Sequence, residues 1–147
     1  GFYKDEFIDY IKEYKSELVN FVVNENVSTG GRAGIYECIK RGILEKVQKD
    51  LRISLETNAI EKFFGSIIKN EAVYGIDAIR KALDYGAVNE LLIVDHFIRK
   101  AEFEKISEKS REQGATVHVI SSEHDAGKKL EGIGGIGATL RFKIEGL

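Results

Sequence analysis

The sequence predicts an α/β fold, a three-layer α-β-α sandwich in which helices cover both faces of a sheet. Two observations in the second half of the chain predict it. Apolar runs of strand length alternate there with segments of helical periodicity, and glycines close two of the helical segments. Elements in this order bury a sheet between two helical layers. We therefore expect a complete domain of this class at 57–147, preceded at 1–56 by the end of an incomplete α/β domain.

The first half of the chain predicts one strand among helices. In 3–15, apolar residues recur at helical spacing, and 17-ELVNFVV-23 is a short apolar run rich in β-branched and aromatic residues. Such a run indicates a buried strand. A polar turn at 24–34 leads to a helix at 33–50, with a break expected near Gly42. A single strand lacks a ladder partner, so we interpret this half as part of a domain whose beginning is missing.

The second half predicts its elements in a regular order. The stretch 51-LRISLET-57 has no clear periodicity and is expected to be a loop. A helix follows at 57–70, where Thr57 or Asn58 is the expected cap and Glu61 completes a capping box. The remaining elements are a short strand or turn at 71–75, helices at 76–86, 99–114 and 124–130, and strands at 90–95, 115–121 and 138–144.

Composition narrows the class of protein. The 147 residues carry a formal net charge of -2, which gives no basic footprint for nonspecific nucleic-acid binding. The single cysteine, Cys38, excludes an intramolecular disulfide and a zinc site built of several thiolates. No apolar run reaches the length of a membrane span and no signal peptide opens the chain, so we expect no membrane partner and a cytoplasmic location. Because the chain lacks Met and begins at Gly1, we also expect a fragment or a processed chain.

The segment 131-EGIGGIGATLRFKIEGL-147 contains the spacing Gly-x-Gly-x-x-Gly at Gly132, Gly134 and Gly137. A dinucleotide site requires such a loop to follow a strand and to open a helix. Here the predicted helix comes before the glycines and the predicted strand after them, so the context is wrong for a cofactor. We expect Gly134, Gly135 and Gly137 instead to allow positive φ or a close backbone approach at the entry to the sheet.

Two further candidates for chemistry have a simpler structural interpretation. Gly30-Gly31 could form an anion nest at a helix start, but a plain turn is favoured. Asp95-His96 ends a predicted central strand, where open α/β sheets often place their sites. An acid–base or metal role would need partners, and His118 and His124 lie on other elements. We therefore favour Asp95 as the cap of the turn that follows the strand.

Four segments of the chain are similar to segments of known proteins, in the same order. The runs 73-VYGIDAIRKALDYGAVNELLIVDHFIR-99 and 114-GATVHVISSEHDAGKKLEGIGGIGATLRF-142 lie in the second half, and 1-GFYKDEFIDYI-11 and 28-STGGRAGIYECI-39 in the first. Together they resemble the C-terminal domain, and the end of the central domain, of the superfamily of Pelota and the class-1 peptide-chain release factors. The resemblance covers essentially the whole chain. It implies a C-terminal domain with the fold of ribosomal proteins that bind kink-turn RNA.

Two details favour the Pelota branch, whose members rescue stalled ribosomes, over the termination factors. The connection from Ile98 to Ser121 is compact, without the small subdomain that release factors insert at this point. The segment SSEHDAG at 121–127 is similar to a Ser-Ser-x-His-x-x-Gly pattern of Pelota proteins. The Gly-Gly-Gln loop that release factors use to hydrolyse peptidyl-tRNA would lie before residue 1, and Gly30-Gly31 is followed by Arg32 instead. The lack of bulky insertions suggests an archaeal member.

The resemblance implies a non-catalytic role in translation. The whole factor would enter a stalled ribosome with a translational GTPase of the elongation-factor type, and would then cooperate with an ABC-type ribosome-recycling ATPase to split the subunits. Gly1-Phe2 resembles the end of a Pro-Gly-Phe motif that faces the GTPase, although the proline is absent. In release factors the strand matching 138-ATLRF-142 docks the GTPase, and we expect Arg141 on its solvent face, free to contact an acidic partner. The implied GTPase-facing residues are Gly1, Phe2, Ala138, Thr139, Leu140, Arg141 and Phe142.

Two alternatives stand beside this interpretation. A metal-dependent endoribonuclease acting on stalled mRNA, an activity attached to this family, would need a divalent metal and clustered carboxylates, and the sequence shows no convincing cluster. A fragment of a class-1 release factor is the other. Kink-turn RNA is not expected as a partner, because Ile76-Asp77 replaces the Asn-Glu pair with which the ribosomal proteins read it. We therefore expect no catalytic residue, no metal ligand and no cofactor.

Overall fold

The structure is a computed structural model that describes residues 2–144, and it divides the chain into two units, Gly1–Lys49 and Asp50–Leu147. The first unit contains α1 (Phe2–Tyr14), the 3-10 helix η1 (Ser16–Phe21), α2 (Gly31–Lys40) and the start of α3 (Ile43–Ile68). Among the side chains described in this unit, Ile11 is the one buried hydrophobic residue. This unit therefore has very little core of its own.

The strand predicted at 17–23 is wrong. Its first part forms η1, and Val22 and Val23 follow as exposed extended chain. The backbone bonds locally instead, as Leu18 N donates to Lys15 O at 2.8 Å and Val22 N donates to Val19 O at 3.2 Å. The described part of this unit contains no second strand that could complete a ladder, and a lone strand is not stable.

The loop predicted at 51–57 is also wrong, because α3 runs through it without a break. Two helices predicted on either side of the loop are thus one helix from Ile43 to Ile68. An ion pair between Arg52 and Glu56, one helical turn apart, stabilises the segment that lacked a clear pattern. The predicted break near Gly42 is confirmed, since Gly42 has φ +70° between α2 and α3. The domain boundary predicted after residue 56 falls inside α3, whereas the two units meet after Lys49.

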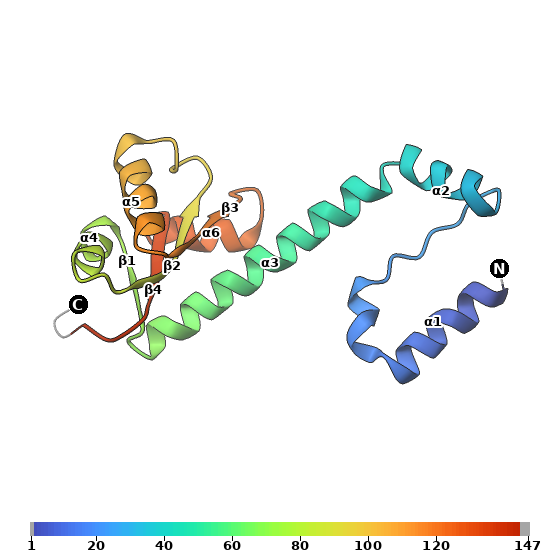
Figure 1. Ribbon diagram of the computed structural model, residues 1–147, viewed down its shortest axis with the longest axis horizontal. Helices are drawn as coiled ribbons and strands as arrows, with labels where there is room; N and C mark the ends of the chain where they lie inside the picture. Colours follow the sequence, from blue (N-terminus) through green and yellow to red (C-terminus); the bar gives the residue numbers. More distant parts are fainter. Residues whose placement is uncertain (1, 145–147) are drawn as a thin grey trace. The chain divides into compact units, whose positions relative to one another are not determined.

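The second unit is built on a four-stranded sheet in the order β1-β4-β2-β3. Its strands are β1 (Ala72–Tyr74), β2 (Val88–Val94), β3 (Thr116–Ile120) and β4 (Ile136–Leu140). β2 and β3 are parallel, and β4 is antiparallel to both of its neighbours, β1 and β2. Figure 1 shows the helices α4 (Ile76–Asp84), α5 (Ala101–Glu112) and α6 (Asp125–Gly132) around these strands.

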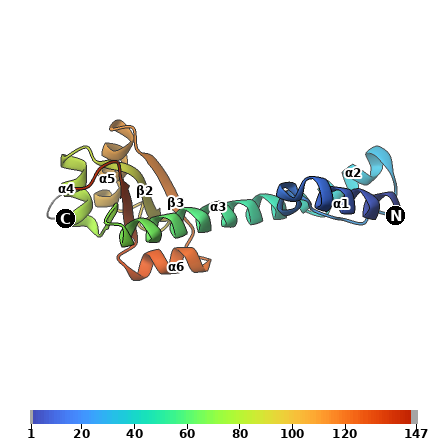
Figure 2. The ribbon, with the colours of Figure 1, turned by 90° about the horizontal axis from the view of Figure 1, so that it is seen from below.

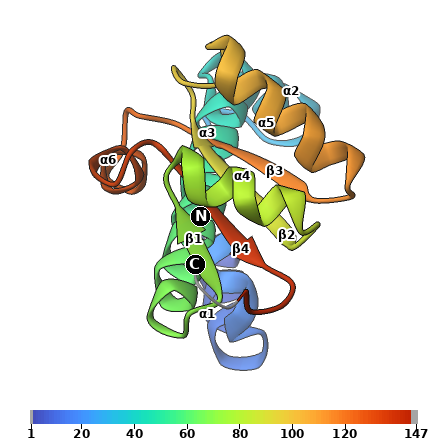
Figure 3. The same cartoon turned by 90° about the vertical axis from the view of Figure 1, so that its left-hand side faces the viewer.

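Helices cover both faces of the sheet, which confirms the predicted α-β-α sandwich (Figures 2 and 3). On one face α4 and α5 pack on Val88, Leu91 and Ile93 of β2 through a core that includes Ile79, Leu83, Phe103 and Ile106. On the other face α3 and α6 pack on the sheet through Ile60, Phe63, Leu92, Val94, Ile120 and Leu130. Successive residues of β2 thus alternate between two cores, as buried strands do. None of the helices described in the chain is long and apolar enough to cross a membrane.

The glycines before β4 have the structural role that the sequence predicted. Gly134 and Gly135 have φ of +105° and +73°, a region that side chains disfavour. Gly137 lies in β4, where an added Cβ would overlap the ring of the fully buried Phe63 and lie 2.7 Å from its Cε2. β4 runs from Ile136 to Leu140, so it begins before the predicted start at 138 and ends before the predicted end at 144.

Gly137→Ala should lower the free energy of unfolding by about 1–3 kcal/mol, because the Phe63 ring must leave its packed position. Urea unfolding followed by circular dichroism measures the change. Phe63→Leu should lower stability by itself. In the double variant Gly137→Ala/Phe63→Leu the loss should be smaller than the sum of the two separate losses, since the smaller leucine leaves room for the alanine methyl group. Strictly additive losses in the double variant would contradict the contact.

Candidate functional site

One end of the sheet brings together three segments of the chain at the close of β4. Arg141 N donates to Ala87 O at 2.8 Å, just before β2, and Leu140 N donates to Glu71 O at 2.8 Å, just before β1. The predicted partner-facing strand is therefore held on both sides. It is an internal strand of the sheet, and its backbone offers no free edge to a partner.

The predicted partner-facing residues differ in exposure. Ala138 and Thr139 are buried, and the Thr139 hydroxyl accepts a hydrogen bond from Glu90 N at 3.2 Å. Leu140 is half-buried against the core under α4 and α5. These three residues hold the strand in place. Arg141 is exposed, and Phe142 is 51% exposed. Gly1 lies outside the described residues, and Phe2 begins α1 in the first unit.

Two large exposed apolar residues that the sequence interpretation missed precede the segments bonded to the end of β4. Ile68 ends α3 shortly before Glu71, and Tyr85 caps α4 shortly before Ala87, so each is close in sequence to a residue that bonds the end of β4. Ile68 is 85% exposed and Tyr85 is 66% exposed. In the sequence, the sign of their exposure was that both residues lie close to the ends of predicted helices, beyond the part of the helix that packs on the sheet. We call Ile68, Tyr85, Arg141 and Phe142 the β4-end surface.

Arg141 has a second role inside the chain. Its Nη2 donates to Gln113 O at 2.9 Å, at the C-terminal end of α5, where a cation also complements the helix dipole. The guanidinium has five N–H donors, and those that do not bond Gln113 can serve a partner. The side chain is therefore oriented by the protein before any partner arrives.

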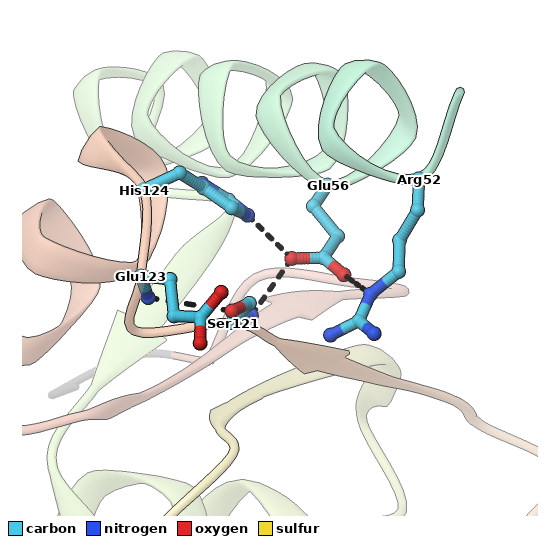
Figure 4. A network of polar contacts seen from close by, with 5 residues as sticks. All are labelled: Arg52, Glu56, Ser121, Glu123 and His124. Atoms are coloured by element: carbon cyan, nitrogen blue, oxygen red, sulfur yellow. Dashed lines mark hydrogen bonds and ion pairs between the residues drawn. The ribbon is translucent and has the colours of Figure 1, made fainter. Parts of the chain in front are cut away.

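A buried carboxylate, that of Glu56, holds the C-terminal end of β3 (Figure 4). The Glu56 side chain, on α3, is only 9% exposed. Its Oε1 accepts from Arg52 Nε at 2.6 Å, and its Oε2 accepts from Ser121 N at 2.7 Å and from His124 Nε2 at 2.6 Å. Burial raises the pKa of Glu56, but the bonds from Arg52, Ser121 and His124 and the charge of Arg52 outweigh it, so the pKa lies below the usual value.

This network accounts for Ser121 and His124 of the Ser-Ser-x-His-x-x-Gly pattern at 121–127. Ser121 and His124 tie the end of β3 and the start of α6 to α3 through Glu56. Gly127, the last residue of the pattern, lies so close to Ser121 that an added Cβ would overlap the Ser121 carbonyl oxygen and lie 2.7 Å from its carbon. The sequence interpretation found the pattern but missed Glu56, because Glu56 lay in the segment predicted as a loop.

The other polar candidates serve separate structural contacts. The Asp95 carboxylate accepts from His96 N at 2.8 Å, which confirms it as the cap of the turn after β2. Burial raises the pKa of Asp95, but hydrogen bonds from Ser122 and His96 outweigh it and the pKa is lowered. His96 also contacts Glu131 at 3.2 Å. Within residues 2–144, no three His, Cys, Asp or Glu side chains gather as metal ligands would.

The Gly30-Gly31 turn is closed by the chain itself. Gly31 has φ +62° at the start of α2, and the Glu37 carboxylate accepts from Ser28 N at 2.9 Å and from Ser28 Oγ at 2.8 Å. A carboxylate in this position repels an anion. The arrangement agrees with the plain turn that the sequence favoured.

Comparisons with known proteins agree with this fold. The family described as eRF1 domain 3 matches residues 53–144. A "Protein pelota homolog" of Methanocaldococcus jannaschii is 47% identical over 146 residues, and one of Pyrococcus furiosus is 44% identical over 149. Each comparison covers 99% of this chain and 42% of the relative, so the chain spans less than half the length of these relatives.

Solved structures give the same relationship. Archaeoglobus fulgidus Pelota superposes with a TM-score of 0.81 and 33% identity, over 99% of this chain and 48% of that one. Archaeal Pelota in a structure of "ribosome-bound archaeal Pelota and ABCE1" superposes with a TM-score of 0.73 and 34% identity, over 99% of this chain and 42% of that one. The archaeal termination factor aRF1 superposes with a TM-score of 0.53 and 28% identity, over 97% of this chain and 41% of that one. Among these three structures, the two Pelota proteins are closer to this chain than the termination factor is.

Proposed function

The chain belongs to the eRF1 domain 3 family, and we propose that it is part of a translation quality-control factor of the Pelota type. Such a factor recognises stalled ribosomes in the cytoplasm and helps to dissociate them. The observation that carries the proposal is the similarity to archaeal Pelota proteins over 99% of this chain, which is closer in identity and TM-score than the similarity to the termination factor aRF1.

Within such a factor, the role proposed for this chain is to bind other proteins. A solved structure describes Pelota with ABCE1 on the ribosome, and another describes yeast Dom34 as a termination-like factor that interacts with Hbs1. By analogy, the partners proposed here are the ribosome, a translational GTPase and an ABC-type ribosome-recycling ATPase. The chain spans 42% of the curated relatives, so these partners are proposed for the whole factor.

The β4-end surface is the part of the second unit proposed to face the GTPase. It combines an oriented cation, Arg141, with three exposed apolar side chains, Ile68, Tyr85 and Phe142. Aromatic residues and Arg are enriched in the contacts that dominate protein interfaces. Ala138, Thr139 and Leu140 contribute by holding Arg141 and Phe142 in place, because their own side chains are wholly or partly covered. Gly1 and Phe2 remain proposed contacts of the GTPase, because they resemble the end of the Pro-Gly-Phe motif.

Arg141→Glu should weaken binding of the translational GTPase about tenfold or more, because it reverses the charge of the oriented, exposed cation proposed to face that partner. Isothermal titration of the parent factor with its GTPase measures the affinity. Arg99→Glu is the matched control, since Arg99 is an exposed arginine in the loop after β2, at the other end of that strand. The Arg141→Glu variant loses the bond to Gln113, so its thermal unfolding is recorded as well. An unchanged affinity with an intact fold would remove Arg141 from the interface.

A further inference from the structure

The outer strand β3 has one edge that the described residues leave unpaired. In its pairing with β2, Asp95 N donates to Ile120 O at 2.9 Å. The N–H and C=O of one strand residue point to the same side and alternate along the strand. Thr116, His118 and Ile120 therefore direct their backbone groups to β2, whereas Val117 and Val119 direct theirs to the outer edge. Within residues 2–144, no hydrogen bond to these outward groups is present.

This edge lacks the usual protection against pairing. Native edge strands are commonly interrupted by proline, lysine or a bulge. The β3 sequence TVHVI contains no proline and no lysine, and its register with β2 is continuous over all five residues. Four of the five residues are β-branched, which favours extended backbone. Val119 is 38% exposed. The edge is thus open, regular and apolar.

We propose that the outer edge of β3 binds an extended peptide segment of a partner protein by strand addition. The length of the edge favours a peptide over a second copy of the chain. Five residues span about 17 Å, and two such strands would bury far less than the roughly 1,200 Å² of a stable interface. Strand addition of a peptide needs only main-chain bonds and alternate side-chain contacts, and it suits transient binding.

The two faces of the edge define the chemistry of the peptide. Val117 packs in the core under α4 and α5, so Val119 exposes an apolar side chain on that face. On the other face His118 lies 3.9 Å from Glu90, and Glu90 is held by Lys62 Nζ at 2.7 Å. Glu90 thus accepts a hydrogen bond from Lys62, whereas the His118 imidazole lies beyond hydrogen-bond distance of it. The Lys62 ammonium has N–H donors beyond the one that Glu90 accepts, and the imidazole N–H is not bonded to Glu90, so a peptide carboxylate can accept from both. The fitting segment alternates β-branched residues facing Val119 with acidic residues facing His118 and Lys62.

The test uses the whole 147-residue chain and the fluorescein-labelled peptide Val-Glu-Val-Glu-Val, with Val-Val-Val-Glu-Glu as the peptide of equal composition and broken alternation. Fluorescence polarisation should show saturable binding of the alternating peptide and at least about tenfold weaker binding of the other. Val119→Pro removes an outward N–H without removing a bond to β2, and proline is tolerated on edge strands. It should weaken binding about tenfold, whereas Val119→Thr, which keeps the N–H, should stay within about twofold of the wild type.

Amide hydrogen exchange of the wild-type chain gives a second readout that needs no variant. The peptide should slow exchange at Val117 and Val119, whose N–H groups point outward. Absence of saturable binding, or binding that ignores both Val119→Pro and the order of the peptide, would overturn the proposal. Self-association of the chain that Val119→Pro abolishes would assign the edge to a second copy and would also overturn it. None of these outcomes depends on binding of the GTPase at the β4-end surface.

Discussion

Gly127→Ala is expected to destabilise the second unit by about 3 kcal/mol or more, the largest effect of an added methyl group among the glycines that the structure describes. The added Cβ would occupy the position of the Ser121 carbonyl oxygen, and backbone cannot rotate aside as a side chain can. Relief requires α6 or the end of β3 to move, and either movement also strains the bonds from Ser121 and His124 to Glu56. Urea unfolding followed by circular dichroism gives the loss.

Gly132→Ala is the matched control, because Gly132 lies in the same helix with nothing within 4 Å of its added Cβ. It should leave stability unchanged or raise it by about 0.5 kcal/mol, since alanine is the better helix former. Equal effects of the two substitutions would show that helix propensity, and not the contact with Ser121, governs position 127.

Glu56→Ala is expected to cost about 3 kcal/mol, because it leaves the Ser121 N–H and the His124 imidazole buried without their acceptor. Glu56→Gln should cost about 1 kcal/mol, since its oxygen can still accept from Ser121 and His124 while only the bond with Arg52 is lost. Arg52→Ala should cost under about 1 kcal/mol, as the Arg52 side chain is 62% exposed. A loss for Arg52→Ala equal to that for Glu56→Ala would contradict this order.

The pH dependence separates the charge of Glu56 from its shape. The pKa of Glu56 is lowered in the folded chain from an ordinary 4.5, so its ionised form contributes stability above that pH. The contribution is lost as the pH falls through the folded pKa. The difference in unfolding free energy between wild type and Glu56→Gln should therefore be full at pH 7 and shrink below about pH 4.5. A difference that stays constant from pH 7 to pH 3 would assign the effect to packing alone.

Local patterns predicted most of the second unit correctly. The helices after Gly75 and before Gly114, the central strand at 90–95 and the positive φ of Gly134 and Gly135 all follow from residues within a few positions of each other. Periodicity and glycine conformations are properties of the local chain, so a sequence displays them directly. The two wrong predictions share a cause. The strand predicted at 17–23 needed a partner strand, and the helix through 51–57 gains from the contacts of Glu56 with residues far along the chain.

The sequence by itself determined the layered α-β-α class of the second unit and the family to which the chain belongs. Only the tertiary structure showed that β4 is an internal strand with Arg141 and Phe142 exposed beyond its end, and that Glu56 is the partner of His124. Strand order and ion-pair partners join residues separated by tens of positions, and many pairings of the same apolar pattern are compatible with one sequence. Packing decides between them, because the observed arrangement buries both cores and gives the Glu56 carboxylate its three donors.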